Sequence, residues 1–255
     1  MPLQRKSGDT AHLTELPTLR EAIVKRPITN VIADKLAGLI ASGILQVGDP
    51  LPSERELSVA LNVSRDAVRG GIQILAAQGI LEISQGARTR VRRSDVGPVT
   101  VGFATARAVD AYNLDSVHAA RLLVERQVVA DAAIGIDARR IAQLEALLAS
   151  QKNALDDPVR FLISDREFHV AIYQASPNRL LADFSTDLYA YMMEYRREAV
   201  GRPGAIATSY ADHVAIVEAL KARDPVAAAE AFAVHTGRIY ATTQLLMQGE
   251  SGPSA

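Results

Sequence analysis

The sequence predicts an α/β winged helix-turn-helix domain in its N-terminal third, followed by an all-α helical bundle. Three observations support this fold class. The 255 residues exceed the usual size of one domain. Between residues 51 and 91, two short helical patterns precede two short strand patterns, and from Asp115 onward the pattern is helical throughout. We expect an N-terminal extension over 1–27, a winged helix over 28–94, a linker over 95–112, a helical domain over 113–247 and a flexible tail over 248–255.

The composition excludes several classes of protein. With 48% hydrophobic and 22% charged residues, the chain can bury ordinary cores. It contains no cysteine, which excludes disulfides and thiolate zinc sites. Residues 1–10 lack the apolar core of a signal peptide, and the longest uncharged run, 36–48, is too short to cross a bilayer. We therefore expect a soluble, cytoplasmic protein with no membrane partner.

The N-terminal domain begins with a helical pattern that runs to about residue 42. A connection containing Gly48 and Pro50 follows it. Ser53 is placed to start a second helix, with two glutamates in its first turn, and Ser64 to start a third helix that ends near Gly79. This is the helix-turn-helix arrangement, in which the second helix of the pair enters the major groove of DNA.

Arginine is placed where such a domain meets DNA. Arg65 and Arg69 are four residues apart and so share one face of the recognition helix, and Arg55 lies in the first turn of the helix before it. Residues 80–83 and 88–91 are expected to pair as a hairpin. Four arginines with no acid among them fall in and after its second strand, at positions 88, 90, 92 and 93. A solvated loop, or a generic helical domain with surface arginines, remains an alternative.

The net charge of −1 conceals an asymmetry between the two parts of the chain. Residues 1–97 carry 13 basic and 10 acidic side chains, a balance of +3, whereas the remainder carries 15 and 19, a balance of −4. Binding to phosphate depends on local basic patches rather than on the charge of the whole chain.

The runs over 43–57 and 63–69, followed by the Gln78-Gly79-Ile80 turn, resemble GntR-family winged-helix regulators. The likeness covers about residues 28–93 and implies that three arginines contact operator DNA and that a glycine of the wing approaches the minor groove. Gly70 and Gly71 depart from the family pattern, because glycine inside a helix costs about 1 kcal/mol. The DNA-binding residues that we predict are Ser53, Arg55, Ser64, Arg65, Arg69, Gly86 and Arg88.

The C-terminal domain is expected to be a bundle of helices. Breakers such as Gly135, Pro158, Pro177 and the Gly201–Gly204 segment separate the helical patterns. The expected helices cover about 115–133, 137–154, 157–175, 178–200, 206–222 and 225–246.

Asp165, His169, His213 and His235 are candidate metal ligands on three of these helices. A spacing of four puts Asp165 and His169 on one helix face, one turn apart. A carboxylate with neutral imidazoles suits a divalent ion, with zinc the first candidate and nickel, manganese or iron as alternatives. Because spacing does not show that the helices meet, each histidine is alternatively a hydrogen-bonded core residue.

The same residues resemble the FCD effector domain of FadR-type GntR regulators. The likeness covers about 113–246 and rests on Asp165-x-x-Phe168-His169, on 175–178, and on the residue pairs that end at His213 and His235. It implies that the four candidates bind a divalent ion and that a small carboxylate effector lies beside it. Arg121 then becomes the candidate partner of that carboxylate. Alternatively, Arg121 forms an ordinary helical ion pair with Glu125, worth about 0.3–0.5 kcal/mol.

These features predict a homodimeric regulator, expected to be a repressor, that binds a palindromic double-stranded operator and responds to an organic acid. A sensor of the metal itself, a purely structural metal, and a metal-dependent enzyme fused to a DNA-binding module are the alternatives. We expect no enzyme, because Glu167 would point away from the ligand face and leave the metal without a general base.

Overall fold

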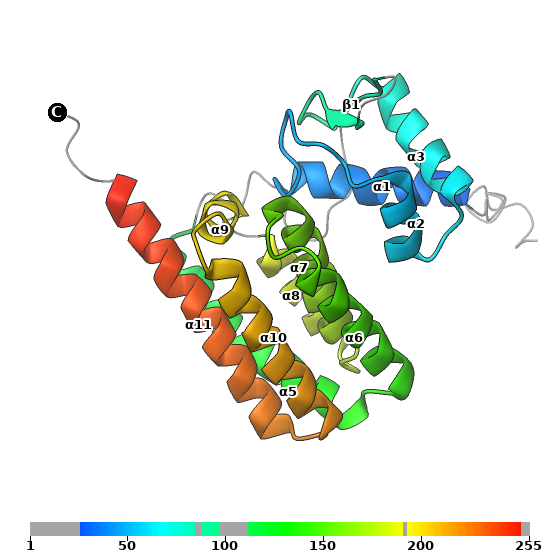
Figure 1. Ribbon diagram of the computed structural model, residues 1–255. Coiled ribbons are helices and arrows are strands. Elements are labelled where there is room, and N and C mark those ends of the chain that lie inside the picture. Colours follow the sequence, from blue (N-terminus) through cyan, green and yellow to red (C-terminus); the bar gives the residue numbers. More distant parts are fainter. Residues whose placement is uncertain (1–25, 85–87, 97–111, 191–192, 251–255) are drawn as a thin grey trace, which may run out of the picture.

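The computed structural model describes residues 26–84, 88–96, 112–190 and 193–250. The N-terminal part consists of α1 (Ile28–Ala41), α2 (Glu54–Leu61) and α3 (Arg65–Ala77), followed by β1 (Leu81–Glu82) and β2 (Arg90–Val91). The two strands pair antiparallel, with Leu81 opposite Val91 (Figure 1). This is the predicted winged helix-turn-helix. No helix among the described residues is long and apolar enough to cross a membrane.

Side-chain caps define the helix-turn-helix. The Ser53 hydroxyl accepts from the Glu56 amide at 3.3 Å, and the Glu56 carboxylate accepts from the Ser53 amide at 2.8 Å, which makes a capping box at the start of α2. Asn62 ends that helix in the left-handed conformation, at φ 52°. Ser64 then starts α3 by accepting from the Ala67 amide at 3.2 Å.

Gly70 and Gly71 let α3 lie close against α1. A Cβ atom at Gly70 would meet Cγ2 of Thr29 at 2.6 Å, and one at Gly71 would meet Cγ2 of Ile32 at 2.7 Å and the Thr29 carbonyl oxygen at 3.1 Å. The two glycines therefore lower the helix propensity of α3 but allow α3 to cross α1 closely.

The C-terminal part is the predicted all-α bundle. Its helices are α5 (Leu114–Gly135), α6 (Ala138–Lys152), α7 (Pro158–Tyr173), α8 (Arg179–Tyr189), α9 (Met193–Val200), α10 (Ala205–Lys221) and α11 (Pro225–Glu250). The long α11 packs along α5 and α10, and α6 packs on α7 (Figure 1). The single helix expected over 178–200 was wrong, because α8 ends at Tyr189 and α9 begins at Met193.

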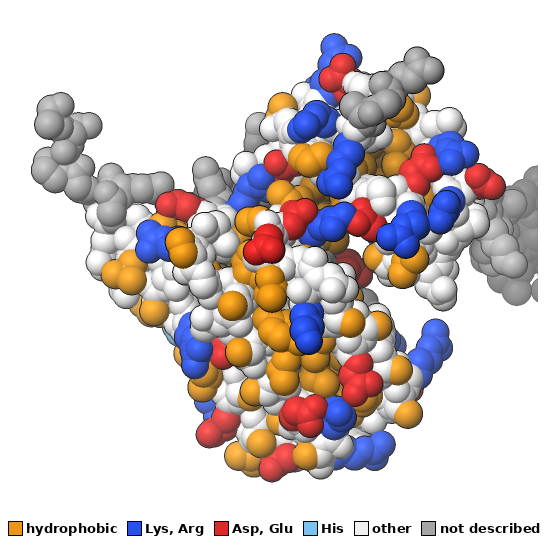
Figure 2. Space-filling view, viewed as in Figure 1, with side chains coloured by type: hydrophobic (Ala, Val, Ile, Leu, Met, Phe, Trp, Pro, Cys, Tyr) orange, Lys and Arg blue, Asp and Glu red, His pale blue; other side chains and the backbone are white. Residues whose placement is uncertain are grey.

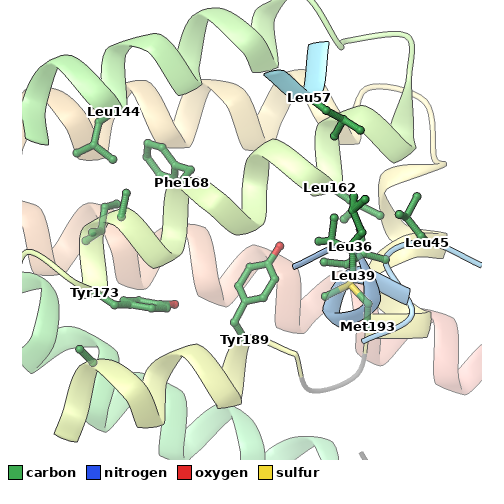
Figure 3. Close-up of a cluster of buried hydrophobic side chains, with 14 of the residues drawn as sticks. Leu36, Leu39, Leu45, Leu57, Leu144, Leu162, Phe168, Tyr173, Tyr189 and Met193 are labelled. Carbon is green, nitrogen blue, oxygen red and sulfur yellow. The ribbon is translucent and has the colours of Figure 1, made fainter. Parts of the chain in front are cut away.

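The two parts share one hydrophobic core. Leu36 and Leu39 of α1 gather with Leu45 of the following loop, Leu162 of α7 and Met193 of α9, all of them buried (Figure 3). Helix α9 lies at the end of the bundle beside the winged helix (Figure 1). The winged helix therefore packs on the bundle through α7 and α9.

Candidate metal centre and DNA-binding surface

The four predicted metal ligands meet inside the bundle. Asp165 and His169 come from α7, His213 from α10 and His235 from α11. Each offers a nitrogen or oxygen atom, and these atoms all lie within 4.8 Å of one another. The four side chains are buried, with relative exposures of 3%, 0%, 0% and 1% in sequence order.

The imidazole nitrogens are spaced as ligands of one ion. Nε2 of His235 lies 3.3 Å from Nε2 of His213 and 3.2 Å from Nε2 of His169. Oδ1 of Asp165 lies 3.4 Å from Nε2 of His213 and 3.8 Å from Nε2 of His169. Ligands about 2.0–2.1 Å from a tetrahedral ion are separated by about 3.3 Å, so the set has the dimensions of a metal cage.

The opposite nitrogen of each ring faces an acceptor. Nδ1 of His213 lies 2.8 Å from Oε1 of Gln151, and Nδ1 of His235 lies 3.6 Å from Oδ2 of Asp212. If these Nδ1 atoms carry the protons, the Nε2 lone pairs face one another across the centre, and a cation relieves their repulsion. This is the arrangement by which proteins orient metal-binding histidines.

His169 is held through a longer chain. Its Nδ1 lies 3.4 Å from the hydroxyl oxygen of Tyr173, and that hydroxyl donates to Oε1 of Glu125 at 2.8 Å. The Tyr173 oxygen is therefore free to accept the Nδ1 proton. Burial raises the pKa of Tyr173 well above its usual value, and the Glu125 carboxylate adds to this increase.

Burial also favours the neutral form of two of the imidazoles, those of His169 and His213. Desolvation lowers the pKa of His169 and of His213 well below the usual histidine value, and the neighbouring His235 lowers both further. A neutral imidazole is the form that binds a metal ion.

The second oxygen of Asp165 has its own partners. Tyr189 donates to Oδ2 at 2.5 Å, and Nη1 of Arg196 lies 3.4 Å from the same atom. The Arg196 guanidinium also lies over the Tyr189 ring, 4.2 Å from its centroid. Burial, followed by the charge of Asp165, raises the pKa of Tyr189, so that its hydroxyl stays a donor.

A small cavity adjoins this centre. Arg121 and His118 of α5, Arg196 of α9, and Thr236 and Tyr240 of α11 contribute to its lining. Nη2 of Arg121, Nη2 of Arg196 and Oγ1 of Thr236 are buried and have no hydrogen-bond partner in the described structure. Unpaired buried donors are rare in folded proteins and indicate a site for a ligand or solvent.

Both interpretations of Arg121 fit the structure. Its Nε atom lies 2.9 Å from Oε1 of Glu125, which makes the buried helical ion pair. Its Nη2 atom remains unpaired. Burial opposes the charged form, but the Glu125 carboxylate and Tyr173 together raise the pKa of Arg121 above the usual guanidinium value. Arg121 therefore combines a charged guanidinium with an unpaired nitrogen, and the residue lines the cavity.

The predicted DNA-binding arginines differ in their surroundings. Arg55 and Arg65 are exposed, and within the described part of the chain neither forms an ion pair. Arg69 instead forms a two-point contact with Glu54, from Nε to Oε1 at 3.1 Å and from Nη2 to Oε2 at 2.8 Å. In this conformation Arg69 links α3 to α2.

The wing arginines also divide into two groups. Nη1 of Arg90 donates to the Gly48 carbonyl at 2.7 Å, and Nη2 of Arg93 donates to the Gln78 carbonyl at 2.8 Å. Arg88 is exposed, and Gly86 lies outside the described residues. Figure 2 shows basic side chains over the upper, DNA-binding part, and acidic and basic side chains side by side where the two parts meet.

Sequence reasoning did not identify several residues around the metal centre. Tyr173 follows His169 by four residues, so the shared helix face was a usable signal. Asp212 and Thr236 are chain neighbours of two ligands. No comparable signal marked Gln151, Tyr189 or Arg196, because only the packing of the helices brings them to the site.

Comparisons with known proteins agree with this architecture. Residues 28–91 match the gntR family of bacterial regulatory proteins, and residues 116–238 match the FCD domain. The HTH-type transcriptional repressor NanR of Cronobacter sakazakii is 28% identical over 253 residues, which are 97% of this chain and 97% of that protein. The Glc operon transcriptional activator of Escherichia coli K12 is 36% identical over 165 residues, 62% of this chain and 64% of that protein.

A solved structure shows the same fold. The Escherichia coli protein McbR/YncC superposes with a TM-score of 0.53 at 20% identity, covering 86% of this chain and 98% of that one. The matched families and relatives are transcriptional regulators rather than enzymes. The chain therefore belongs to the GntR family of bacterial regulators, as a DNA-binding transcriptional regulator with a C-terminal FCD domain.

Proposed function

We propose that a small carboxylate, bound beside a divalent metal ion in the FCD domain, controls the affinity of this regulator for its operator. The observation that carries the proposal is the group of unpaired donors at the cavity. The free ends of Arg121 and Arg196 and the Thr236 hydroxyl all lack a partner. Two guanidinium groups and a hydroxyl match the acceptors of a carboxylate or hydroxycarboxylate.

Asp165, His169, His213 and His235 would hold the metal ion. Three imidazoles and a carboxylate suit zinc first, with nickel, manganese and iron as alternatives. When bound, the ion would supply positive charge and a Lewis acid that a carboxylate oxygen could contact. Tyr189 and Arg196 orient Asp165, while Gln151, Asp212 and Tyr173 orient the three imidazoles.

The DNA-binding part would read the operator through Arg55 and Arg65, with Ser53, Ser64, Arg69, Gly86 and Arg88 as further contacts. Two copies of the chain would bind a palindromic site, because a two-fold dimer imposes its symmetry on the DNA. Repression is the simplest mode: bound protein blocks transcription, and the effector releases it. The nearly full-length relative named above is a repressor.

A screen of zinc-loaded protein against small carboxylic acids tests the effector. A ligand at 100 times its dissociation constant adds about 2.7 kcal/mol of stability, which raises the thermal midpoint by several degrees. Replacing Thr236 by valine removes one unpaired hydroxyl and preserves the shape of the side chain. We expect Thr236→Val to fold normally and to bind the acid less tightly.

Thr242→Val is the matched control. Thr242 lies on the same helix, is half-buried, and donates its hydroxyl proton to the Arg238 carbonyl at 2.9 Å. It should bind the acid as the wild type does. If every acid leaves the midpoint unchanged while metal removal changes operator affinity, the protein senses the metal itself and the carboxylate proposal fails.

A further inference from the structure

Two consecutive arginines of α9 face different sites. Arg196 reaches Asp165 in the metal centre, and Arg197 reaches Asp49 in the DNA-binding part. We propose that Arg197 is a positioning residue: through α9 it sets the placement of the winged helix according to the state of the metal centre. The link to the metal centre rests on the function proposed above. The positioning of the winged helix by Arg197 does not.

Arg197 makes three polar contacts with the DNA-binding part. Its Nη2 lies 2.8 Å from Oδ1 of Asp49, its Nη1 lies 2.8 Å from Oδ2 of Asp49, and Nη1 also donates to the Ile44 carbonyl at 2.8 Å. The two side chains are only 21% and 16% exposed. A two-point guanidinium–carboxylate contact fixes orientation as well as distance, which a lysine in this place would not do.

Asp49 belongs to a loop that is bonded to the wing. The Asp49 carbonyl accepts from the Val91 amide at 3.0 Å, and the Gly48 amide donates to the Val91 carbonyl at 2.8 Å. The Leu51 amide donates to the Thr89 carbonyl at 2.8 Å. Oδ2 of Asp49 also accepts from the Gln46 amide at 2.8 Å. A displacement of Asp49 is therefore transmitted directly to β2 and the wing.

Arg196 connects the same helix to the metal centre. Its side chain is 4% exposed, contacts Oδ2 of Asp165 and covers the Tyr189 ring. Its Nη2 is unpaired, and the residue lines the cavity. A charge that enters the cavity, or an ion that withdraws electron density from Asp165, changes the balance of forces on this one side chain.

Helix α9 is suited to transmit a change at Arg196 to the winged helix. Adjacent helical residues point about 100° apart, so α9 presents Arg196 to the centre and Arg197 to the loop at the same time. At its start, Met193 is buried in the shared core, and its Cγ lies 3.8 Å from the position of a Cβ atom at Gly43. Met193 and Arg197 therefore both join α9 to the winged-helix part.

Helix α7 crosses the same boundary but carries two of the four ligands. Arg160 of α7 pairs with Glu56 of α2, and Glu167 lies 3.7 Å from Lys35 of α1. Because Asp165 and His169 hold α7 in place, we assign it the role of a fixed support. Helix α9 contributes none of the four candidate ligands, so we assign it the role of the element that shifts.

Distance measurements between two spin labels test the proposal. The chain has no cysteine, so Glu82→Cys on the wing and Ala142→Cys on α6, both exposed, give one labelled pair. In the protein that carries both labels, we expect a narrow distribution of label-to-label distances. Its centre should differ between zinc-loaded and chelator-treated protein. Arg197→Ala should broaden the distribution in both states and abolish the difference between them.

Further variants test whether the effect is specific to the contact between Arg197 and Asp49. Asp49→Asn removes the charge from the other side of the contact and should reproduce Arg197→Ala. Arg202→Ala removes an exposed guanidinium just beyond α9 and should behave as the wild type. On operator DNA selected in vitro, the zinc-dependent change in affinity should fall from at least about 5-fold to below about 2-fold in Arg197→Ala.

The outcomes separate this inference from the proposed function. If Arg197→Ala and Asp49→Asn keep the narrow wild-type distribution, Arg197 does not position the winged helix and the inference is wrong. If zinc neither binds nor shifts the wild-type distribution, while both variants broaden it, the positioning role stands and the metal-dependent function fails.

Discussion

Tyr189 donates a 2.5 Å hydrogen bond to Oδ2 of Asp165, and the other oxygen of that carboxylate lies 3.4 Å from Nε2 of His213. One oxygen of Asp165 is thus fixed from α8 while the other faces the imidazoles. A monodentate carboxylate held in this way keeps a single direction toward a bound ion. Tyr189 therefore belongs to the candidate metal centre, although it is not one of the four candidate ligands.

Replacing Tyr189 by phenylalanine should weaken metal binding without unfolding the protein. The ring and its stacking under Arg196 remain, and only the hydroxyl that orients Asp165 is lost. Loss of such a partner reduces metal affinity by about 10–100-fold. Competition with a chromogenic chelator measures the change. Tyr240→Phe, which removes the hydroxyl that bonds to Asp115, is the control, and equal affinities in the two variants would contradict the role of Tyr189.

Removing the metal should lower the thermal stability of the protein. Without a cation, the buried imidazoles of His169, His213 and His235 lie within 3.3 Å of a neighbouring imidazole with no positive charge between them. An ion bound at 1,000 times its dissociation constant contributes about 4 kcal/mol. Calorimetry with and without a chelator should show a difference of several degrees that disappears in His235→Gln. An unchanged midpoint in the wild type would exclude a bound ion.

Alanine at Arg65 should weaken operator binding while leaving stability intact. The side chain is exposed at the first position of α3, where residues of a recognition helix reach base edges. Loss of a base contact costs about 1–3 kcal/mol, or about 5–150-fold in affinity. Fluorescence anisotropy with labelled operator measures this change. Arg139→Ala, an exposed arginine of the bundle, should bind as the wild type does. An equal loss in both variants would indicate nonspecific charge.

His118 should titrate below its usual pKa of 6.5. Partial burial lowers the pKa first and the charge of Arg121 adds to this, while Glu125 and Asp115 oppose both. The folded protein then binds fewer protons at this site than the unfolded chain. The site's contribution to stability is complete above about pH 6.5 and decreases as the pH falls toward the folded-state value.

Two measurements check this expectation. The imidazole of His118 should show a midpoint below pH 6.5 by nuclear magnetic resonance. His118→Phe retains a ring to stack on Tyr240, whose centroid lies 4.0 Å away, and should flatten the acid side of the stability profile. A midpoint above 6.5 would mean that the carboxylates outweigh burial.

Local chemistry explains what the sequence alone could predict. The helix-turn-helix follows from Ser53 and Ser64, because each caps the helix after it within three residues. The pairing of Asp165 with His169 follows from a spacing of four. Both features depend on residues that are close in the chain, where one sequence is enough to predict geometry.

Tertiary packing determines what could not be predicted. No glycine or proline lies between Arg179 and Val200, so nothing in the pattern marked the end of α8 or the start of α9. The direction in which the Arg196 side chain points depends on the break between α8 and α9. The partners of the imidazoles likewise come from helices far apart in sequence, as Gln151 and His213 show. Gly70 and Gly71 appeared only unfavourable until the position of α1 was known.

Alanine at Gly71 should destabilise the winged helix, although alanine is the better helix former. The gain in propensity is up to about 1 kcal/mol. A new Cβ atom would meet Cγ2 of Ile32 at 2.7 Å and the backbone oxygen of Thr29 at 3.1 Å, and a buried β-branched side chain cannot turn aside. Overpacking of this kind costs about 1–3 kcal/mol, so the clash outweighs the gain.

Gly38→Ala, on α1, should instead stabilise the folded protein. A Cβ atom there meets nothing within 4 Å, so only the propensity gain of about 0.5–1 kcal/mol remains. Chemical denaturation of the two variants should therefore move their midpoints in opposite directions from the wild type. If Gly71→Ala were as stable as Gly38→Ala, α1 and α3 would have to lie further apart than they do here. The glycine pair would then have no role in the crossing.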